Sequence, residues 1–133
     1  MAYMNWNDTF SVGVEEIDSQ HKQLINMVNE FYDNLNHERE AFGKLLNSLV
    51  DYAGYHFSTE EKYMHKFNYP DTYIHEKEHE MFIKKAIDVK KLYEEGKLVI
   101  SLEITNFIKE WIVNHVLGTD KKYSKCFVDN GLR

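Results

Sequence analysis

The sequence is poor in cysteine, proline and long apolar runs. It contains 1 cysteine and 1 proline among 133 residues. A lone cysteine, Cys126, excludes an internal disulfide and a metal site built from several thiolates. No apolar run approaches the roughly 20 residues that a membrane-spanning helix needs, so we expect no membrane insertion. Residues 1–10 lack the basic and apolar regions of a signal peptide, and the predicted location is cytoplasmic.

The sequence also lacks an excess of positive charge. Its net charge is -6, from 16 Lys and Arg against 22 Asp and Glu. Nucleic acids and anionic membranes are both bound by basic surfaces, so neither is an expected partner. The sequence does contain 43% hydrophobic and 14% aromatic residues, which is enough for a folded core and argues against disorder.

Helical periodicity runs through most of the chain. Apolar side chains recur at helical spacing over residues 18–35, 40–66, 71–95 and 100–118, and residues 121–128 predict a short final helix. No segment alternates as a strand would. We therefore predict an all-α fold and a single domain over residues 1–133. Its expected parts are an N-terminal arm (1–17), an up-down-up-down four-helix bundle (18–118) and a C-terminal segment (119–133).

Histidine falls on the apolar stripe of each of the four predicted bundle helices. Six candidate metal ligands share this placement: His21, His56, Glu60, His75, His79 and His115. They lie at the start of the first helix, late in the second, at the start of the third and at the end of the fourth. In an antiparallel bundle these four places are at the same end, so the sequence predicts one inward-facing cluster.

This cluster has the chemistry of a metal site. A buried glutamate is costly unless it is paired or bound to a cation, and clustered imidazoles resist protonation in an apolar interior. Residues four apart share a helix face, so His56 with Glu60, and His75 with His79, can each bind at one place. Nitrogen and oxygen ligands favour iron, manganese, copper or zinc, and ligand type alone does not separate iron from manganese.

Asp120 is a seventh candidate ligand. It follows His115 by five residues, which on an ideal α-helix places the two about 140° apart. Gly118 lies between them, so we expect the helix to end or distort there and Asp120 to fold back over the cluster. Seven ligands are too many for one tetrahedral zinc ion and suit two ions that share carboxylates.

Each of these residues also has a simpler interpretation. A lone histidine on an apolar face is usually a core residue, and a His–Glu pair is usually a surface pair, so the prediction depends on the convergence of four helices. His37 and His65 lie in polar surroundings and are interpreted as surface residues. Cys126 is interpreted as having no part in the function. Plain core positions are predicted for the following residues: Met27, Phe31, Phe82 and Trp111.

Two other metal-binding patterns fit less well. His75-Glu76-Lys77-Glu78-His79 matches HExxH, the zinc protease signature in which Glu76 would be the general base. Phe82 and Lys85 stand where the extended motif requires glycine and a third histidine, and the histidines of the other three helices would be unused. Glu76 is expected beside the metal face, in solvent. Ferritin-like bundles use two Glu-x-x-His elements, and this chain has one.

Five stretches match the motifs of one family: Val12-Gly13-Val14, Ile17-Asp18-Ser19-Gln20-His21-Lys22, His56-Phe57-Ser58-Thr59-Glu60, His75-Glu76-Lys77-Glu78-His79, and Trp111-Ile112-Val113-Asn114-His115 with its continuation to Asp120. Through them nearly the whole chain resembles the hemerythrins, specifically single-domain bacteriohemerythrins. The resemblance implies one iron ion bound by His75, His79 and His115, and a second bound by His21 and His56. It further implies that Glu60, Asp120 and an oxo or hydroxo group bridge the two ions.

The same resemblance implies that dioxygen binds reversibly at an open position on the second iron. Leu24, Phe57, Trp111 and Leu117 are the expected apolar walls, and a dry pocket would slow irreversible oxidation. The sequence shows no acid or base beside the cluster, so we predict a monomeric, non-enzymatic protein for oxygen carriage, storage or supply. An oxygen-consuming enzyme is a candidate partner. The alternatives are a di-iron peroxidase or oxygen-reducing enzyme, and an oxygen sensor that acts through a separate partner.

Overall fold

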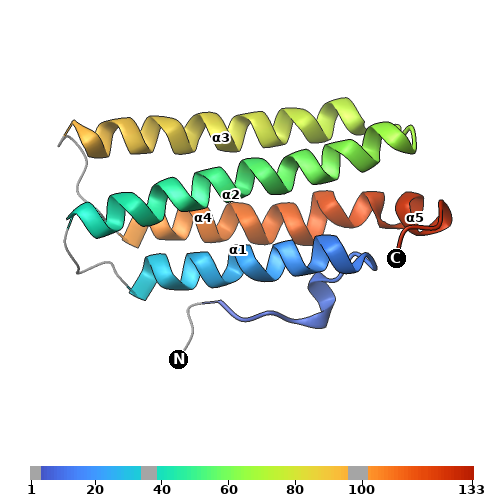
Figure 1. Cartoon of the computed structure of the whole chain (residues 1–133), viewed down its shortest axis with the longest axis horizontal. Coiled ribbons are helices and arrows are strands. Elements are labelled where there is room, and N and C mark those ends of the chain that lie inside the picture. Colours follow the sequence, from blue (N-terminus) through green and yellow to red (C-terminus); the bar gives the residue numbers. More distant parts are fainter. Residues whose placement is uncertain (1–3, 34–38, 96–101) are drawn as a thin grey trace.

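The computed structural model describes residues 4–33, 39–95 and 102–133, most of which are helical (Figure 1). The elements are Asp8–Phe10 (η1, a 3₁₀ turn), Glu15–Asp33 (α1), Arg39–Lys66 (α2), Thr72–Glu94 (α3), Leu102–Asn114 (α4), His115–Asp120 (η2, a π-helix) and Lys121–Asp129 (α5). The described ranges contain no strand, and the predicted all-α fold is confirmed.

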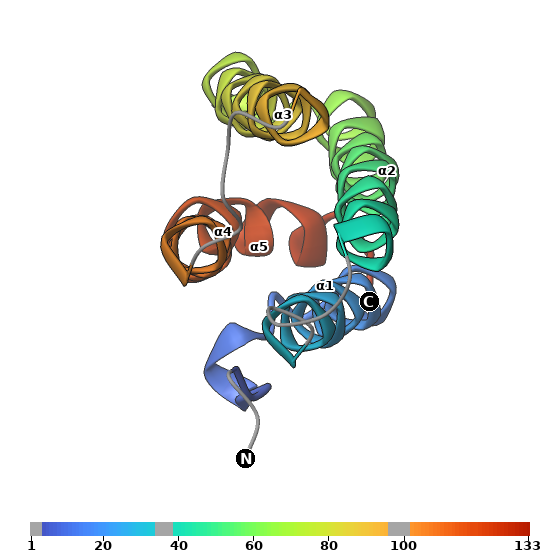
Figure 2. The ribbon, with the colours of Figure 1, turned by 90° about the vertical axis from the view of Figure 1, so that its left-hand side faces the viewer.

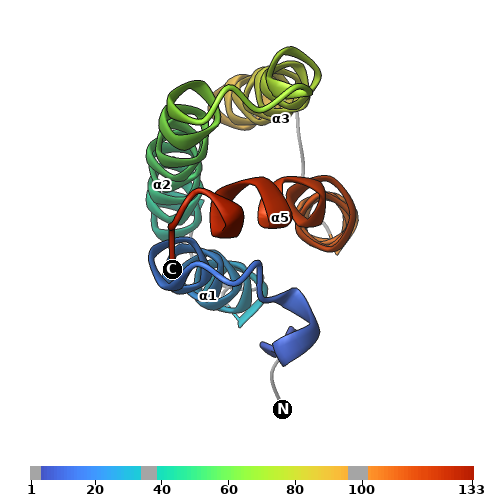
Figure 3. The same ribbon diagram turned by 90° about the vertical axis from the view of Figure 1, so that its right-hand side faces the viewer.

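Helices α1 to α4 run alternately up and down along the long axis, and α5 crosses one end of the bundle (Figures 1 and 3). Helix α2 packs against α1 and α3, and α1 also contacts α4. Helices α3 and α4 lie farther apart than these pairs (Figure 2). Large side chains fill the space between α3 and α4. For example, the ring centroids of Phe82 and Trp111 are 4.3 Å apart. Among the described residues, no helix has both the length and the apolar character needed to cross a bilayer.

The N-terminal arm is held against α1 by hydrogen bonds. Met4 and Asn29 exchange two of them, at 2.7 and 2.8 Å. Asp18 accepts two more, from the hydroxyl of Ser11 and the backbone N–H of Val12. Helix α1 begins at Glu15 rather than at Asp18 as expected, because a first turn rich in carboxylates suits the positive end of the helix dipole. The expected end of this helix falls on residues 34–38, outside the described ranges.

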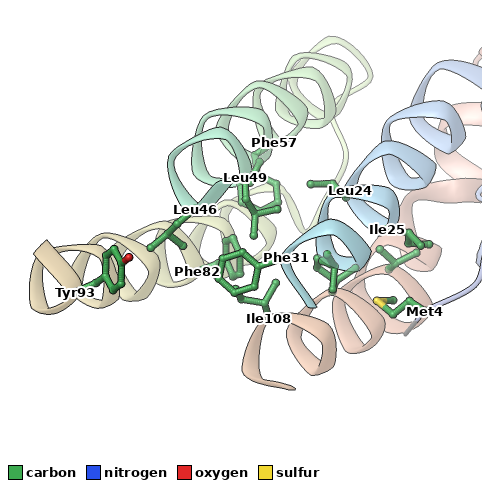
Figure 4. Close-up of a cluster of buried hydrophobic side chains, with 14 residues drawn as sticks. Met4, Leu24, Ile25, Phe31, Leu46, Leu49, Phe57, Phe82, Tyr93 and Ile108 are labelled. Carbon is green, nitrogen blue, oxygen red and sulfur yellow. The ribbon is translucent and has the colours of Figure 1, made fainter. Parts of the chain in front are cut away.

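Two apolar clusters stabilise the bundle. The larger fills its centre (Figure 4) and buries Phe31 and Phe82, with Met27 and Trp111 partly buried against it, as predicted. The smaller lies at the end crossed by α5 and consists of Val12, Val14, Ile17, Met64, Tyr69, Tyr123 and Phe127. Along α2, Phe57 belongs to the first cluster and Met64 to the second. Glu60 lies between them, so the predicted cluster of ligands is enclosed by apolar side chains on both sides.

Candidate metal centre

All seven predicted ligands converge between the two apolar clusters. They form two groups in which the possible ligand atoms all lie within 4.8 Å of one another. One group contains His75, His79, His115, Glu60 and Asp120, and the other contains His21, His56, Glu60 and Asp120. Each of these residues is at most 3% exposed. The two carboxylates belong to both groups, which is the arrangement that two neighbouring metal ions with bridging carboxylates require.

Asp120 contacts both groups through different oxygen atoms. Its Oδ2 lies 3.0 Å from Nε2 of His21. Its Oδ1 lies 2.9 Å from Nε2 of His75 and 2.8 Å from Nε2 of His115. Glu60 also reaches both groups, since its Oε1 lies 3.1 Å from Nε2 of His56 and 3.3 Å from Nε2 of His79. Each carboxylate is therefore placed to link the two groups.

Many of these close contacts are not hydrogen bonds. Both ring nitrogens of His21 and of His75, and both oxygens of Asp120, are buried without a hydrogen-bond partner. By contrast, Nε2 of His79 and Nε2 of His115 lie within hydrogen-bonding distance of each other, at 3.1 Å. Buried polar atoms in proteins are nearly always paired, so a group of them that face one another without partners is suited to binding a cation. The residues present therefore fit a metal.

The charges of the cluster favour a cation as well. Burial alone would raise the pKa of Glu60 and of Asp120, but their contacts with the surrounding histidines outweigh burial and lower both pKa values. Burial lowers the pKa of His56, so this ring stays neutral and keeps a free lone pair. Burial acts in the same direction on His79, but its contacts with Glu60 and Glu61 outweigh burial and raise its pKa to about 9.

A π-helix brings Asp120 to the cluster. His115 and Asp120 are the first and last residues of η2. A π-helix forms i→i+5 hydrogen bonds, so residues five apart lie on one face, which an α-helix does not allow. The helix was expected to end or distort at Gly118. The backbone does not end there, since it continues through η2 into α5, but it is distorted, because η2 is a π-helix. Gly118 is not among the residues with positive φ, so the wider turn, and not a reversal of the chain, aligns Asp120 with His115.

Gln20 fixes the orientation of His56. It is 5% exposed, and its Oε1 lies 2.6 Å from Nδ1 of His56. Its amide nitrogen donates to the hydroxyl of Thr59 at 3.2 Å, and that hydroxyl donates to the backbone carbonyl of Tyr55. This chain orients the amide so that Oε1 accepts from Nδ1–H of His56, which leaves the Nε2 lone pair free for a metal.

Tyr123 of α5 contacts the cluster from the opposite side. It is fully buried, and its hydroxyl donates a hydrogen bond of 2.5 Å to Oε2 of Glu60. Its ring stacks on Phe127, with centroids 4.2 Å apart. Burial, together with the charges of Asp120 and Glu60, raises the pKa of Tyr123 well above 10, so the hydroxyl keeps its proton.

Neither Gln20 nor Tyr123 was identified from the sequence as part of the site. A signal existed for Gln20, because it is a polar residue on the apolar stripe that continues through Leu24, Val28 and Phe31. Two carboxylates outside the ligand set were missed as well. Glu61 lies 3.9 Å from Nδ1 of His79. Glu78, which accepts a hydrogen bond from Thr119, lies 4.0 Å from Nδ1 of His115.

Leu24, Phe57 and Trp111 line a cavity of about 10 Å³ beside the cluster, and the same cavity touches His56 and Asp120. We refer to it as the inner cavity. Its volume is near the lower limit for one water-sized molecule. The side chain of Leu117, the fourth expected wall residue, lies outside the described part of the chain.

The remaining histidines were expected to be apart from the cluster. His65 has a side chain that is 67% exposed, and its Nε2 lies 2.5 Å from Oε1 of Glu76. The prediction of a surface position for His65 is confirmed, and this contact holds Glu76, which is 27% exposed, away from the ligands. His37 falls outside the described residues.

The chain is similar to known proteins over most of its length. A family model, the hemerythrin HHE cation binding domain, matches residues 12–126. A bacteriohemerythrin of Methylococcus capsulatus is 35% identical over 128 residues, which cover 95% of this chain and 98% of that protein. A hemerythrin-like protein of Naegleria gruberi is 34% identical over 119 residues, covering 90% of this chain and 89% of that protein. A crystal structure of wild-type hemerythrin matches with a TM-score of 0.91 and 35% identity, over 94% of this chain and 98% of that one.

Proposed function

Since this chain belongs to the hemerythrin family, we propose that it binds two non-haem iron ions at its seven-residue cluster and uses them to bind dioxygen reversibly. The observation that carries the proposal is the pair of ligand groups sharing Glu60 and Asp120. One ion would be bound by His75, His79 and His115, and the other by His21 and His56. When bound, the pair supplies the electrons that dioxygen accepts on binding and returns on release.

The side chains around the cluster support binding in preference to turnover. The inner cavity is walled by apolar groups such as Leu24 and Phe57, which exclude water and slow the loss of reduced oxygen species. The hydroxyl of Tyr123 donates its hydrogen bond to Glu60, and its raised pKa makes it a weaker proton donor. Carriage, storage or local supply of oxygen by a monomer in the cytoplasm, with an oxygen-consuming enzyme as partner, belongs to the same proposal.

Cycles of oxygenation test this function. The iron-loaded protein is reduced without air, exposed to dioxygen, and then flushed with inert gas, while its visible absorption is recorded. We expect a charge-transfer band that appears and disappears over repeated cycles. A single irreversible oxidation that releases peroxide would instead favour the peroxidase or oxygen-reducing enzyme. The Glu60→Ala variant is the control, since it lacks a carboxylate common to both groups.

A further inference from the structure

A second, larger hollow lies between α2 and α3 and reaches the edge of the site at His79. It has a volume of about 400 Å³, and its lining includes Gly54, Phe57, His79, Ile83 and Ile87. We refer to it as the α2–α3 groove. Most of the exposed surface of its lining is apolar, and Phe57 and His79 are among its buried residues, at 3% exposure each. A groove of this kind suits a small apolar molecule on its way to the cluster.

Phe57 belongs to both the α2–α3 groove and the inner cavity. Its ring stacks on His79 with centroids 3.9 Å apart and an angle of 6° between the planes. Its centroid also lies 5.6 Å from that of Trp111. One aromatic ring therefore separates the groove from the space beside the ligands. Rotation of that ring is a small motion compared with the opening of a helix pair.

Gly54 keeps the groove open above Phe57. It precedes Phe57 by three residues, so the two share a face of α2. A Cβ atom added at Gly54 would meet nothing within 4 Å, so no close packing requires a glycine there. Glycine inside a helix costs about 0.5–1 kcal/mol relative to alanine. Gly54 lowers the stability of α2, and the open groove beside it offers a reason for a glycine at this position.

The other hollow near the site is more firmly closed. It has a volume of about 450 Å³, lies between α3 and α4, and is lined by Met81, Phe82, Phe107 and Trp111 among others. Two rings, Phe82 and Trp111, separate it from the inner cavity, with centroids 4.3 Å apart. Phe107 stacks on the first of them at 6.4 Å. Passage here would require the displacement of several packed rings.

We propose that the α2–α3 groove is the route by which dioxygen reaches the site, with Gly54 keeping it open and the Phe57 ring as its inner gate. This inference rests on the proposed function. Glu61, Glu80 and Asp88 also line the groove, together with one lysine, Lys84. Their excess of negative charge favours neutral molecules over anions, which matches an uncharged ligand.

Filling the groove tests the route. Gly54→Leu places a side chain in the groove on the face of α2 that carries Phe57, where an added Cβ atom meets nothing within 4 Å, and Gly54→Ala is the matched control. We expect Gly54→Leu to slow both association and release of dioxygen at least about tenfold, equivalent to about 1.4 kcal/mol of added barrier. The equilibrium affinity should stay unchanged, because the end states are the same. Met81→Trp, in the α3–α4 hollow, should leave both rates as they are. Unaltered rates in Gly54→Leu, or slower rates in Met81→Trp alone, would overturn the proposal.

A metal-free measurement separates this inference from the proposed function. Xenon occupies apolar cavities and needs no iron. Under xenon pressure, we expect the amide signal of Gly54 and the ring signals of Phe57 to shift in the metal-free chain, and these shifts to be lost in Gly54→Leu. If xenon shifts these signals but the iron-loaded protein does not bind dioxygen, the oxygen function is refuted and the proposal of an open groove stands. Absence of these shifts in the wild-type chain would refute the groove as a route.

Discussion

The hydroxyl of Tyr123 donates a hydrogen bond of 2.5 Å to Oε2 of Glu60, a residue 63 positions earlier in the chain. Oε1 of the same carboxylate faces His56 and His79, one from each ligand group. The bond therefore fixes one oxygen of a carboxylate that both metal positions would share. It also ties α5 to α2 across the end of the bundle.

Removal of this bond should weaken metal binding at both positions. We expect Tyr123→Phe to leave Oε2 of Glu60 without a donor and to lower the free energy of unfolding by about 1–3 kcal/mol. Loss of a group that orients a ligand typically costs about 10- to 100-fold in metal affinity. Iron retention against a chelator, and the position of the charge-transfer band, measure the effect. Tyr69→Phe is the control, since Tyr69 contacts the ring of Tyr123 within the same apolar cluster. Equal iron retention in both variants would contradict the assigned role.

Replacement of Gln20 should affect one metal position more than the other. Its amide orients His56, which belongs only to the group with His21. We expect Gln20→Leu to reduce affinity there by about 10- to 100-fold, while the group with three histidines keeps its ion. Titration with limiting ferrous iron should then show one tight and one weak site per chain. Gln23→Leu is the control, because Gln23 is exposed on the same helix. Equal loss from both sites would show that Gln20 acts on the fold and not on His56.

Removal of a ligand should lower the iron content, and the decrease should be larger for a ligand that belongs to both groups. Glu60→Ala removes a residue common to both groups, and His79→Ala removes a ligand of one group. We expect bound iron well below two ions per chain in both variants, with the lower content in Glu60→Ala. His65→Ala and His37→Ala should retain the iron content of the unaltered chain. Full iron content in both ligand variants would refute the assignment of the cluster.

Metal binding should release protons near neutral pH. The pKa of His79 in the metal-free chain is raised to about 9, so the ring is protonated below that pH, whereas a bound metal requires the neutral ring. Affinity should therefore rise with pH up to about 9, by about tenfold per unit for each proton displaced. His56, with its lowered pKa, contributes no proton there. Anaerobic calorimetry of ferrous binding in buffers of different ionisation enthalpy counts the protons. The same heat in every buffer would contradict the prediction.

The fold and six of the ligands could be predicted from the sequence because both depend on the helical spacing of residues. Helical spacing places the ligands on the inward face of each helix, and the antiparallel order of the four helices brings them to the same end of the bundle. The α-helical period fails after His115, where the backbone changes to i→i+5 bonding. The sequence therefore predicted the role of Asp120 from family resemblance, and attributed its position to an end or a distortion of the helix at Gly118. The structure contains the distortion, as a π-helix, and not the end.

The groups that orient the ligands were harder to predict. A search for apolar periodicity treats Gln20 as an interruption of the stripe of α1, although burial of its amide is what fixes His56. Tyr123 contacts Glu60 only because the π-helix directs α5 back across the bundle end. Tertiary contacts of this kind depend on the angle between helices, which the local sequence pattern does not contain.

The two glycines Gly118 and Gly13 should respond to alanine in opposite ways. Gly118 lies within η2, and a Cβ atom there meets nothing within 4 Å. We expect Gly118→Ala to stabilise the chain by about 0.5–1 kcal/mol and to leave the iron content unchanged. Gly13 has a φ of +77°, and its added Cβ would lie 3.3 Å from Val128. Gly13→Ala should therefore destabilise the chain by about 1 kcal/mol or more.

Urea denaturation and iron analysis of the two variants decide what aligns Asp120. The wider turn of η2 explains the position of Asp120 if Gly118→Ala retains both iron ions. Loss of iron in Gly118→Ala, without loss of the fold, would mean that the freedom of the glycine backbone is needed after all. Because Gly13 lies in the arm, away from the ligands, Gly13→Ala shows how far a loss of stability alone lowers the iron content.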